Sequence, residues 1–290
     1  MHIPVLLKET IDLLNPQPNQ NFVDGTLGEG GHSAAILERT TPHGKLLGID
    51  LNTGTLKIAQ EKLTTDKLIT DRLILVQGNF SNIKEITRTN EFITIHGILL
   101  DLGLSSRILE QSGRGFSFQR DEPLDMRYGE EGVPAVELVN QADPETLERI
   151  LTEYGEEPHA RSIVKSIIHH RQQKPIITTF DLVKAIEAVA PRRGKIHPAT
   201  RTFQALRIAV NRELEILEHT LRDSIDILAP HGRLAVISYH SLEDRIVKTF
   251  LKTHTDSLII LTKKPIVPSK EELQTNPRSR SAKLRVAEKK

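Results

Sequence analysis

Short apolar runs alternate with helical patterns through the first hundred residues of the chain. Leu56, Ala59 and Leu63 form one apolar stripe at helical spacing between two such runs. Alternation of strand-length runs with helices predicts a parallel α/β sheet. The runs are Asn21–Asp24, Lys45–Asp50, Arg72–Gln77 and Ile95–Asp101. Carboxyl ends of parallel strands meet at one edge, where ligands bind, so we expect Gly28–His32, Asp50, Phe80 and Asp101 at that edge.

The period changes to that of helices from about Ser106 to Ala209. Apolar residues at helical spacing then fill two long stripes, and a shorter helix is predicted at Asp181–Ala190. The stripes are Ala160, Ile163, Val164, Ile167 and Ile168, and Phe203, Leu206, Val210, Leu214, Leu217 and Leu221. A strand, Arg233–Tyr239, follows the turn PHG. We therefore predict a sheet domain made of 1–105 and 210–290, interrupted by a helical domain at 106–209.

A glycine-rich loop follows the first predicted strand and allows two ligands. Its string GEGGHS, beginning at Gly28, is a near match to the dinucleotide fingerprint G-x-G-x-x-G, and Asp50 follows Gly30 by twenty residues. This spacing fits the ribose of NAD and therefore a dehydrogenase. An enzyme that binds S-adenosylmethionine needs nearly the same parts. Both readings stay open on this pattern alone.

Three side chains favour S-adenosylmethionine over NAD. Asp24 directly precedes the loop, where a carboxylate suits a cationic ligand better than a pyrophosphate. Phe80 offers an apolar face for adenine, and Asp101 ends the strand nearest the reactive end of such a cofactor. Each also has a structural explanation, because Asp24 can cap the loop, Phe80 can belong to the core and Asp101 can cap a helix. Their joint placement at one edge favours a methyltransferase.

Composition excludes several kinds of chemistry. The 290 residues contain no cysteine, which excludes disulfides, thiolate metal sites and cysteine nucleophiles. No His, Asp and Glu cluster has metal-site spacing, so we expect no required metal. The chain shows no pattern of a signal peptide and no uncharged apolar run of the roughly 18 residues that a membrane span needs. We therefore expect a cytoplasmic protein without a membrane partner. The sequence does not indicate the oligomeric state.

The net charge of +1 conceals two basic segments. One lies between Pro191 and Arg212, and the other is the C-terminal stretch from Arg278. Such segments on a near-neutral protein indicate a polyanionic partner, although a solvated helix face and a frayed tail give the same pattern. As residues that contact RNA phosphates we predict Arg192, Arg193, Lys195, Arg201, Arg278, Arg280, Lys283 and Arg285.

Several strings of the chain, in order, resemble those of one family. They are HIPVLLKE (2–9), DGTLGEGGHS (24–33), GNFS (78–81), DLGLSS (101–106), RGFSF (114–118), PLDMR (123–127), HPATRTFQALRIAVN (197–211), ISYHSLEDR (237–245) and NPRSRSAKLRVAEK (276–289). With these strings the chain resembles, almost end to end, the bacterial 16S rRNA cytosine-N4 methyltransferases of the RsmH (MraW) type.

The resemblance implies a class I S-adenosylmethionine-dependent methyltransferase fold, which is Rossmann-like, with an inserted helical domain for substrate recognition. It also implies methylation of the exocyclic N4 of a cytosine in the decoding centre of 16S rRNA, presented as free RNA or as a small ribosomal subunit. Where the family has a glutamine that contacts the cofactor, this chain has Ile108, whose side chain forms no hydrogen bond. The cofactor contacts implied by the resemblance are Gly30, Gly31, His32, Asp50, Phe80 and Asp101.

An exocyclic amine can attack the methyl group directly, without a covalent enzyme intermediate. Its lone pair is delocalised into the ring, so an acceptor that holds an N4 proton would make the amine a better nucleophile. We expect Asp101, or its backbone neighbours in DLGLSS, to be that acceptor, and a role of Asp101 in positioning the cofactor alone stays open. His240 lies near the same edge, where a structural hydrogen bond and a catalytic role are equally consistent with the sequence. A dehydrogenase and a non-catalytic RNA-binding assembly factor remain the alternative functions.

Overall fold

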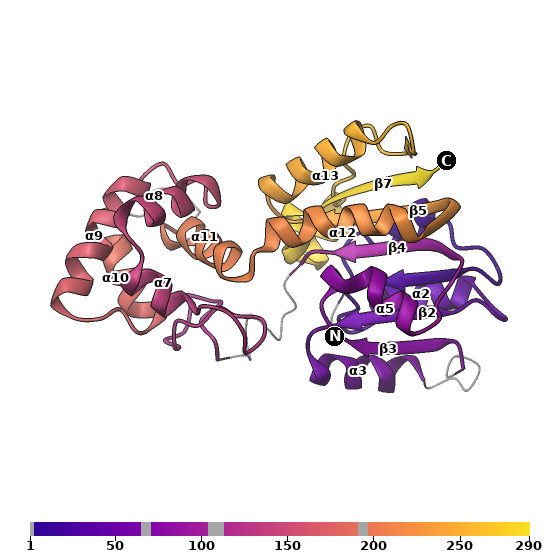
Figure 1. Cartoon of the computed structure of the whole chain (residues 1–290), viewed down its shortest axis with the longest axis horizontal. Coiled ribbons are helices and arrows are strands. Elements are labelled where there is room, and N and C mark those ends of the chain that lie inside the picture. Colours follow the sequence, from indigo (N-terminus) through magenta and orange to yellow (C-terminus); the bar gives the residue numbers. More distant parts are fainter. Residues whose placement is uncertain (1–2, 65–70, 104–112, 191–196) are drawn as a thin grey trace. The chain divides into compact units, whose positions relative to one another are not determined.

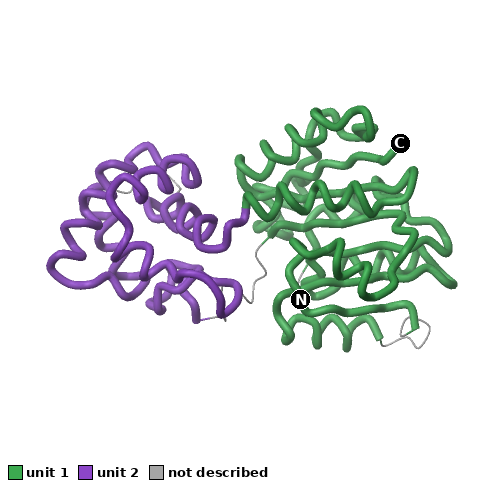
Figure 2. The backbone as a smooth tube through the Cα atoms, in the orientation of Figure 1, with its two compact units in different colours: residues 1–103, 214–290 green, residues 104–213 purple. Residues whose placement is uncertain are grey.

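The chain divides into two compact units. A computed structural model describes residues 3–64, 71–103, 113–190 and 197–290. Residues 1–103 and 214–290 make up the first unit, called here the sheet unit, and residues 104–213 make up the second, the helical unit (Figure 2). Each unit has its own apolar core. Part of the chain therefore leaves the sheet after its fourth strand and returns before its fifth.

Seven strands form the sheet in the order β3-β2-β1-β4-β5-β7-β6. Figure 1 labels β2, β3, β4, β5 and β7 of this sheet. β1 pairs in parallel with both β2 and β4, and β4 pairs in parallel with β5. The strand order therefore reverses between β1 and β4, which is where an open α/β sheet offers a ligand crevice. The strands are β1 (Asn21–Asp24), β2 (Leu46–Asp50), β3 (Leu73–Gln77), β4 (Ile95–Asp101), β5 (Leu228–Ser238), β6 (Leu258–Ile260) and β7 (Lys283–Lys289).

Neighbouring residues of each central strand enter opposite cores. In β1, Phe22 packs with the core that includes α1 (Leu7–Leu14), α2 (Gly31–Arg39) and α3 (Thr53–Leu63). Val23, the next residue, packs with α5 (Ile83–Thr89), α12 (Glu213–Ile227) and α13 (Ser241–Thr253). Strands buried on both faces have nearly continuous apolar sequences, which is why β1, β2 and β4 could be predicted from short apolar runs. The edge strand β3 is only partly buried, but its sequence is also an apolar run.

The C-terminal stretch forms part of the sheet. β7 pairs antiparallel with β5 on one side and with β6 on the other. Leu284 and Val286 enter one core, and Ala287 enters the other. From the sequence, this stretch was interpreted only as a basic segment, and neither β6 nor β7 was predicted. The fifth strand was also predicted to start at Arg233, whereas β5 begins at Leu228.

In the described part of the helical unit, five helices surround the core. α8 begins at Pro144 with Asp143 as its cap, and α10 begins with a capping box between Thr178 and Asp181. The helices are α7 (Ala135–Gln141), α8 (Pro144–Glu153), α9 (Ala160–Gln173), α10 (Thr179–Glu187) and α11 (Ala199–Asn211). Two short elements follow α13 in the sheet unit, α14 (Lys270–Thr275) and η2 (Pro277–Ser281). Among the described residues, no helix is both long and apolar enough to cross a membrane.

Candidate active site

Three aspartates end three parallel strands of the sheet unit at one edge. Asp24 is the last residue of β1, Asp50 the last of β2 and Asp101 the last of β4. Register pairs Asp24 with Gly48 and with Leu99, so all three strands run out at the same side of the sheet. This is the edge at which the sequence analysis expected the ligand.

The loop between β1 and α2 requires glycine at two positions for different reasons. Gly30, at the N-cap of α2, has a φ of 72°, which is in the left-handed region. A Cβ atom there would also lie 2.9 Å from Cδ1 of Leu63. A Cβ atom on Gly31 would lie 2.2 Å from Cγ of Pro4. Gly31 is therefore needed for the N-terminal segment to pack across the start of α2.

Asp24 stabilises this loop from inside. Its side chain is 1% exposed, accepts a hydrogen bond from Oγ of Ser33 at 2.7 Å and another from N of Thr26 at 3.1 Å. Burial raises the pKa of the Asp24 carboxyl, and the bonds from Ser33 and Thr26 oppose that rise. The interpretation that Asp24 faces a cationic ligand is therefore wrong, because its carboxylate is enclosed and joins β1 to α2.

Asp50 has the geometry expected of a ribose-binding carboxylate. Its Oδ2 accepts from N of Gly28 at 3.0 Å, and its Oδ1 accepts from N of Asn52 at 2.8 Å. Burial raises the pKa of Asp50, while these two backbone bonds lower it. The residue is only partly buried, and each carboxylate oxygen can accept a second hydrogen bond. Two adjacent hydroxyl groups would therefore fit here, and they would offset part of the cost of burying the charge.

The side chain of His32 points toward the N-terminal segment. It is 6% exposed, and its Nε2 lies 3.0 Å from the carbonyl oxygen of Val5. Only the backbone of His32, in the first turn of α2, is therefore placed to meet a ligand. N–H groups in the first turn of a helix have no acceptor within the helix and favour an anion such as a carboxylate.

Phe80 and Asp101 lie beside the glycine loop. Phe80 begins the short helix η1 (Phe80–Asn82) and is partly buried against the α5 and α12 core, so one side of its ring is packed. The backbone N of Asp101 donates to Oγ1 of Thr26 at 2.6 Å, which joins β4 to the loop. Oδ1 of Asp101 accepts from N of Gly103 at 3.2 Å. The Asp101 carboxylate thus turns toward its own following loop.

Tyr239 lies next to Asp101. It was not among the site residues predicted from the sequence. A Cβ atom on Gly103 would lie 2.8 Å from Cε2 and 3.0 Å from the hydroxyl oxygen of Tyr239. Burial, the negative charge of Asp101 and a hydrogen bond to the Asp101 side chain all raise the pKa of the Tyr239 phenol. A tyrosine at the end of the predicted fifth strand was the only available hint, because its neighbour depends on how β4 and β5 align.

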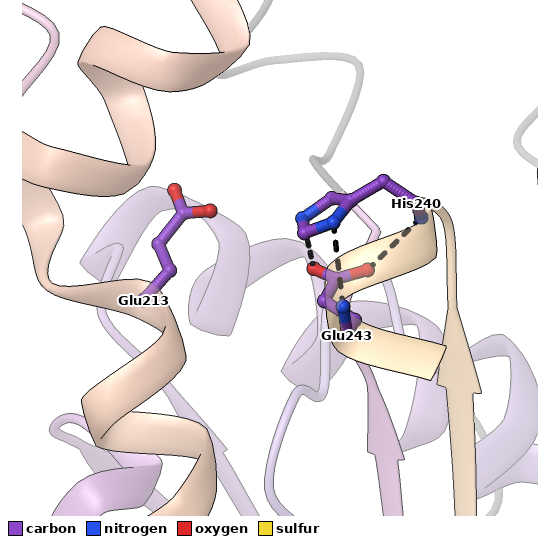
Figure 3. Close-up of side chains that lie close together, drawn as sticks. All are labelled: Glu213, His240 and Glu243. Carbon is purple, nitrogen blue, oxygen red and sulfur yellow. Dashed lines mark hydrogen bonds and ion pairs between the residues drawn. The ribbon is translucent and has the colours of Figure 1, made fainter. Parts of the chain in front are cut away.

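His240 is the N-cap residue of α13 (Figure 3). Its Nδ1 accepts from N of Glu243 at 3.4 Å, and Oε2 of Glu243 accepts from N of His240 at 3.3 Å. Nε2 of His240 lies 3.0 Å from Oε1 of Glu243, in an ion-pair contact that is not aligned as a hydrogen bond. These contacts form a capping box, so the structural explanation for His240 accounts for its position.

The predicted RNA-contacting residues fall into different environments. Arg278 and Arg280 are exposed on η2, and the exposed Arg201 donates from Nη1 to the carbonyl oxygen of Glu156 at 3.2 Å. Outside the described residues lie Arg192, Arg193, Lys195 and also Ile108.

Arg285 and Lys283 are paired inside the sheet unit. Arg285 is 6% exposed, and its Nε donates to Oδ1 of Asp244 at 2.7 Å. Nζ of Lys283 donates to Oδ2 of the same carboxylate at 3.2 Å. We therefore correct the prediction for Arg285, because a buried guanidinium held by a carboxylate is not available to a phosphate. Lys283 shares that partner and is better explained by the fold.

Comparison with known proteins decides between the two readings of the glycine loop. The model of the MraW methylase family matches residues 1–290. The chain belongs to this family. MraW methylases are S-adenosylmethionine-dependent methyltransferases, and so is this protein. The interpretation of the glycine loop as the NAD site of a dehydrogenase is therefore wrong.

Similar proteins cover nearly the whole chain. Several relatives are named ribosomal RNA small subunit methyltransferase H. The one from Dehalococcoides mccartyi strain BAV1 is 47% identical to this chain over 306 residues, which is 99% of this chain and 86% of that protein. The one from Heliobacterium mobile is 45% identical and the one from Clostridium botulinum strain Kyoto 46%, each over 310 residues, 99% of this chain and 98% of theirs. A crystal structure of a candidate rRNA-methylase from Clostridium thermocellum has a TM-score of 0.50 at 14% identity and full coverage of both chains. That likeness agrees with the Rossmann-like class I fold.

The residues at the sheet edge fit S-adenosylmethionine. Asp50 can accept hydrogen bonds from the two ribose hydroxyls, and Phe80 presents a partly packed ring beside the loop. A Cβ atom on Gly28 would meet only the carbonyl oxygen of Thr26, at 3.9 Å, so the backbone there is open to close approach. The start of α2 suits the carboxylate of the methionine portion.

Proposed function

We propose that this enzyme transfers a methyl group from S-adenosylmethionine to the exocyclic N4 of a cytosine in the decoding centre of 16S rRNA. The names of its relatives support ribosomal RNA of the small subunit as the substrate. The proposed nucleotide and atom come from the family resemblance of the motifs. We also propose that the enzyme works in the cytoplasm, where this substrate is assembled, and that it requires no metal.

The position of the Asp101 carboxylate carries the proposal. It ends β4 beside the point where the strand order reverses, and it accepts a hydrogen bond from its own loop. S-adenosylmethionine supplies an electrophilic methyl group when bound. A carboxylate oxygen of Asp101 would accept a hydrogen bond from the N4 amine, localise its lone pair and hold it in line. The absence of cysteine excludes the thiolate that would otherwise serve a covalent route to the ring carbon.

We propose that the cofactor is held by Gly30, Gly31, the His32 backbone, Asp50 and Phe80, with Asp101 at its reactive end. The proposed role of His32 is limited to its N–H group, because the imidazole contacts Val5. Asp50 would bind the ribose, since its two oxygens are already oriented by Gly28 and Asn52. Phe80 would contact the adenine ring.

The target base must leave its stack to reach the reactive end, which requires contacts to the phosphates that flank it. We propose Arg278 and Arg280 of the sheet unit for this role, together with Arg201 and residues 192, 193 and 195 of the insertion. The helical insertion would then recognise the substrate, as the predicted domain at 106–209 implies. Phosphate contacts of this kind add affinity without choosing the base.

One experiment tests the reaction and its substrate form together. The protein is incubated with methyl-labelled S-adenosylmethionine and either naked 16S rRNA or small subunits that lack the modification, and the labelled nucleotide is then mapped. We expect label on N4 of one cytosine. Label on another base or atom would refute the proposed specificity, and RNA binding without label would favour the assembly-factor alternative.

The role of Asp101 is tested by Asp101→Asn in single turnovers at saturating cofactor. Because the amide has one acceptor oxygen and no charge, we expect the rate to fall by about 100-fold or more. Asp71→Asn is the matched control, since Asp71 is exposed and precedes β3, at the opposite edge of the sheet. An unchanged rate in Asp101→Asn, together with weaker cofactor binding, would limit Asp101 to holding the cofactor.

A further inference from the structure

The register of β4 and β5 brings a phenol to the edge of the sheet where Asp101 lies. Asp101 pairs with Ile237, and N of Leu102 donates to the carbonyl oxygen of Ile237 at 2.9 Å. Because the two strands are parallel, Tyr239 lies just beyond the same edge as Gly103. The two residues belong to segments that are far apart in the sequence but within the same compact unit.

The hydroxyl end of Tyr239 rests on the loop that Asp101 contacts. A Cβ atom on Gly103 would lie 2.9 Å from Cζ and 3.0 Å from the hydroxyl oxygen of Tyr239, so only glycine leaves room for the ring. The N–H of the same Gly103 donates to Oδ1 of Asp101. The carboxylate of Asp101 and the hydroxyl of Tyr239 therefore both lie beside Gly103.

Tyr239 is itself fixed by Glu243. N of Tyr239 donates to Oε2 of Glu243 at 2.8 Å, and Glu243 is 4% exposed at the start of α13. The capping box with His240 orients that carboxylate (Figure 3). A buried carboxylate that accepts several donors is rigid, so the backbone that carries the phenol is fixed as well.

Tyr239 remains a hydrogen-bond donor at working pH. Burial raises the pKa of its phenol, and the nearby negative charge of Asp101 raises it further. The charges of Glu243 and Glu272 raise the pKa of Tyr239 in the same direction as that of Asp101. The phenol is therefore protonated and can donate, and the carboxylate of Asp101 is a nearby acceptor.

We propose that Tyr239 is a positioning residue for methyl transfer, whose hydroxyl holds the Asp101 carboxylate in the orientation that receives the target amine. This inference rests on the proposed function of Asp101. A carboxylate on a single Cβ atom can rotate, and two donors on it remove that freedom. Misplacement of a catalytic group by about 1 Å can cost about 100-fold in rate, so the hydroxyl has a large effect without touching the substrate.

The test removes only the hydroxyl, with Tyr239→Phe, and combines it with Asp101→Asn. Single-turnover rates are measured at saturating S-adenosylmethionine on small subunits that lack the modification. We expect Tyr239→Phe to be slower by about 10-fold or more, with a cofactor dissociation constant within about 2-fold of the wild-type value. In the Asp101→Asn background the same change should have no further effect. Asp71→Asn, at the opposite edge of the sheet, is the control and should be as fast as the wild type.

A readout without activity separates positioning from a general loss of structure. Thermal unfolding midpoints of the protein without cofactor are compared for the two single variants and the double variant. Coupled residues give a smaller loss in the double variant than the sum of the single losses. Additive midpoint shifts, a wild-type rate in Tyr239→Phe, or an equal slowing in both backgrounds would each overturn the inference. Failure of the wild-type protein to methylate N4 would instead refute the proposed function, and the unfolding comparison would still test the contact.

Discussion

Two neighbouring basic segments of the chain have the same charge and opposite environments. Arg278 and Arg280 lie exposed on η2. Lys283 and Arg285 follow a few residues later on β7, where both are paired with Asp244. In the sequence they form one run of basic residues. The comparison shows that positive charge identifies a phosphate-binding surface only when the backbone leaves that charge in solvent. On β7, pairing with β5 and β6 places Arg285 inside the protein and Lys283 beside the same carboxylate.

The largest expected effect comes from removing the partner of the buried segment. Asp244→Ala leaves the guanidinium of Arg285, which is 6% exposed, without its carboxylate. Breaking one side of a buried ion pair costs about 3 kcal/mol or more, so we expect the free energy of unfolding in urea to fall by about that amount. Asp256→Ala, at an exposed carboxylate, is the control and should change stability by less than about 0.5 kcal/mol. Equal losses in both variants would show that the Asp244 pairs contribute nothing.

The same contrast has a pH dependence. Burial tends to raise the pKa of Asp244, but its hydrogen bond and charge interaction with Arg285, and then those with Lys283, lower it below the ordinary 3.8. A carboxyl whose pKa is lower in the folded than in the unfolded state stabilises the fold at pH values above its unfolded pKa. This stabilisation is lost as the pH falls through the folded pKa. The stability difference between the wild-type protein and Asp244→Ala should therefore be full near about pH 7 and shrink toward about pH 3. Urea unfolding of both proteins at each pH measures it, and a constant difference would contradict the pairing.

A smaller effect is expected from the exposed segment, and it concerns binding rather than folding. If Arg278 and Arg280 contact phosphates, replacing both with alanine should lower the salt slope of RNA binding by about 1.5 and the affinity by about 10-fold. Stability should change by less than about 0.5 kcal/mol, because both residues are exposed. The control replaces Lys57 and Lys252, which are exposed on α3 and α13. Equal slopes for the two double variants would remove η2 from the proposed RNA surface.

The sequence predicted the first four strands and the edge where their carboxylates gather. β1, β2 and β4 are buried on both faces and β3 is partly buried, so their apolar runs are continuous, and Asp50 and Asp101 stand at the ends of β2 and β4. Such features are local in the chain. The contact between Asp101 and Tyr239 is not, because it depends on the alignment of β4 with a strand that follows the whole insertion. No spacing within the sequence contains that register.

Side-chain direction was also beyond the sequence. His32 has the position of a ligand contact, yet its ring meets Val5, because the N-terminal segment packs across the start of α2. For Asp24, one residue number did not show whether the carboxylate was enclosed or open. The alternation of Leu284 and Val286 with charged residues did indicate a strand, but the density of basic residues there favoured a surface segment.

The place of β7 has a consequence for how the protein is made. The last strand of the chain lies inside the sheet, between β5 and β6. During synthesis, every other strand leaves the ribosome before the one that joins β5 to β6. Until then β5 has an unpaired edge, which is a site for pairing with other chains. Folding of the sheet unit is therefore completed only after β7 has been made, and loss of β7 would leave the edge of β5 open.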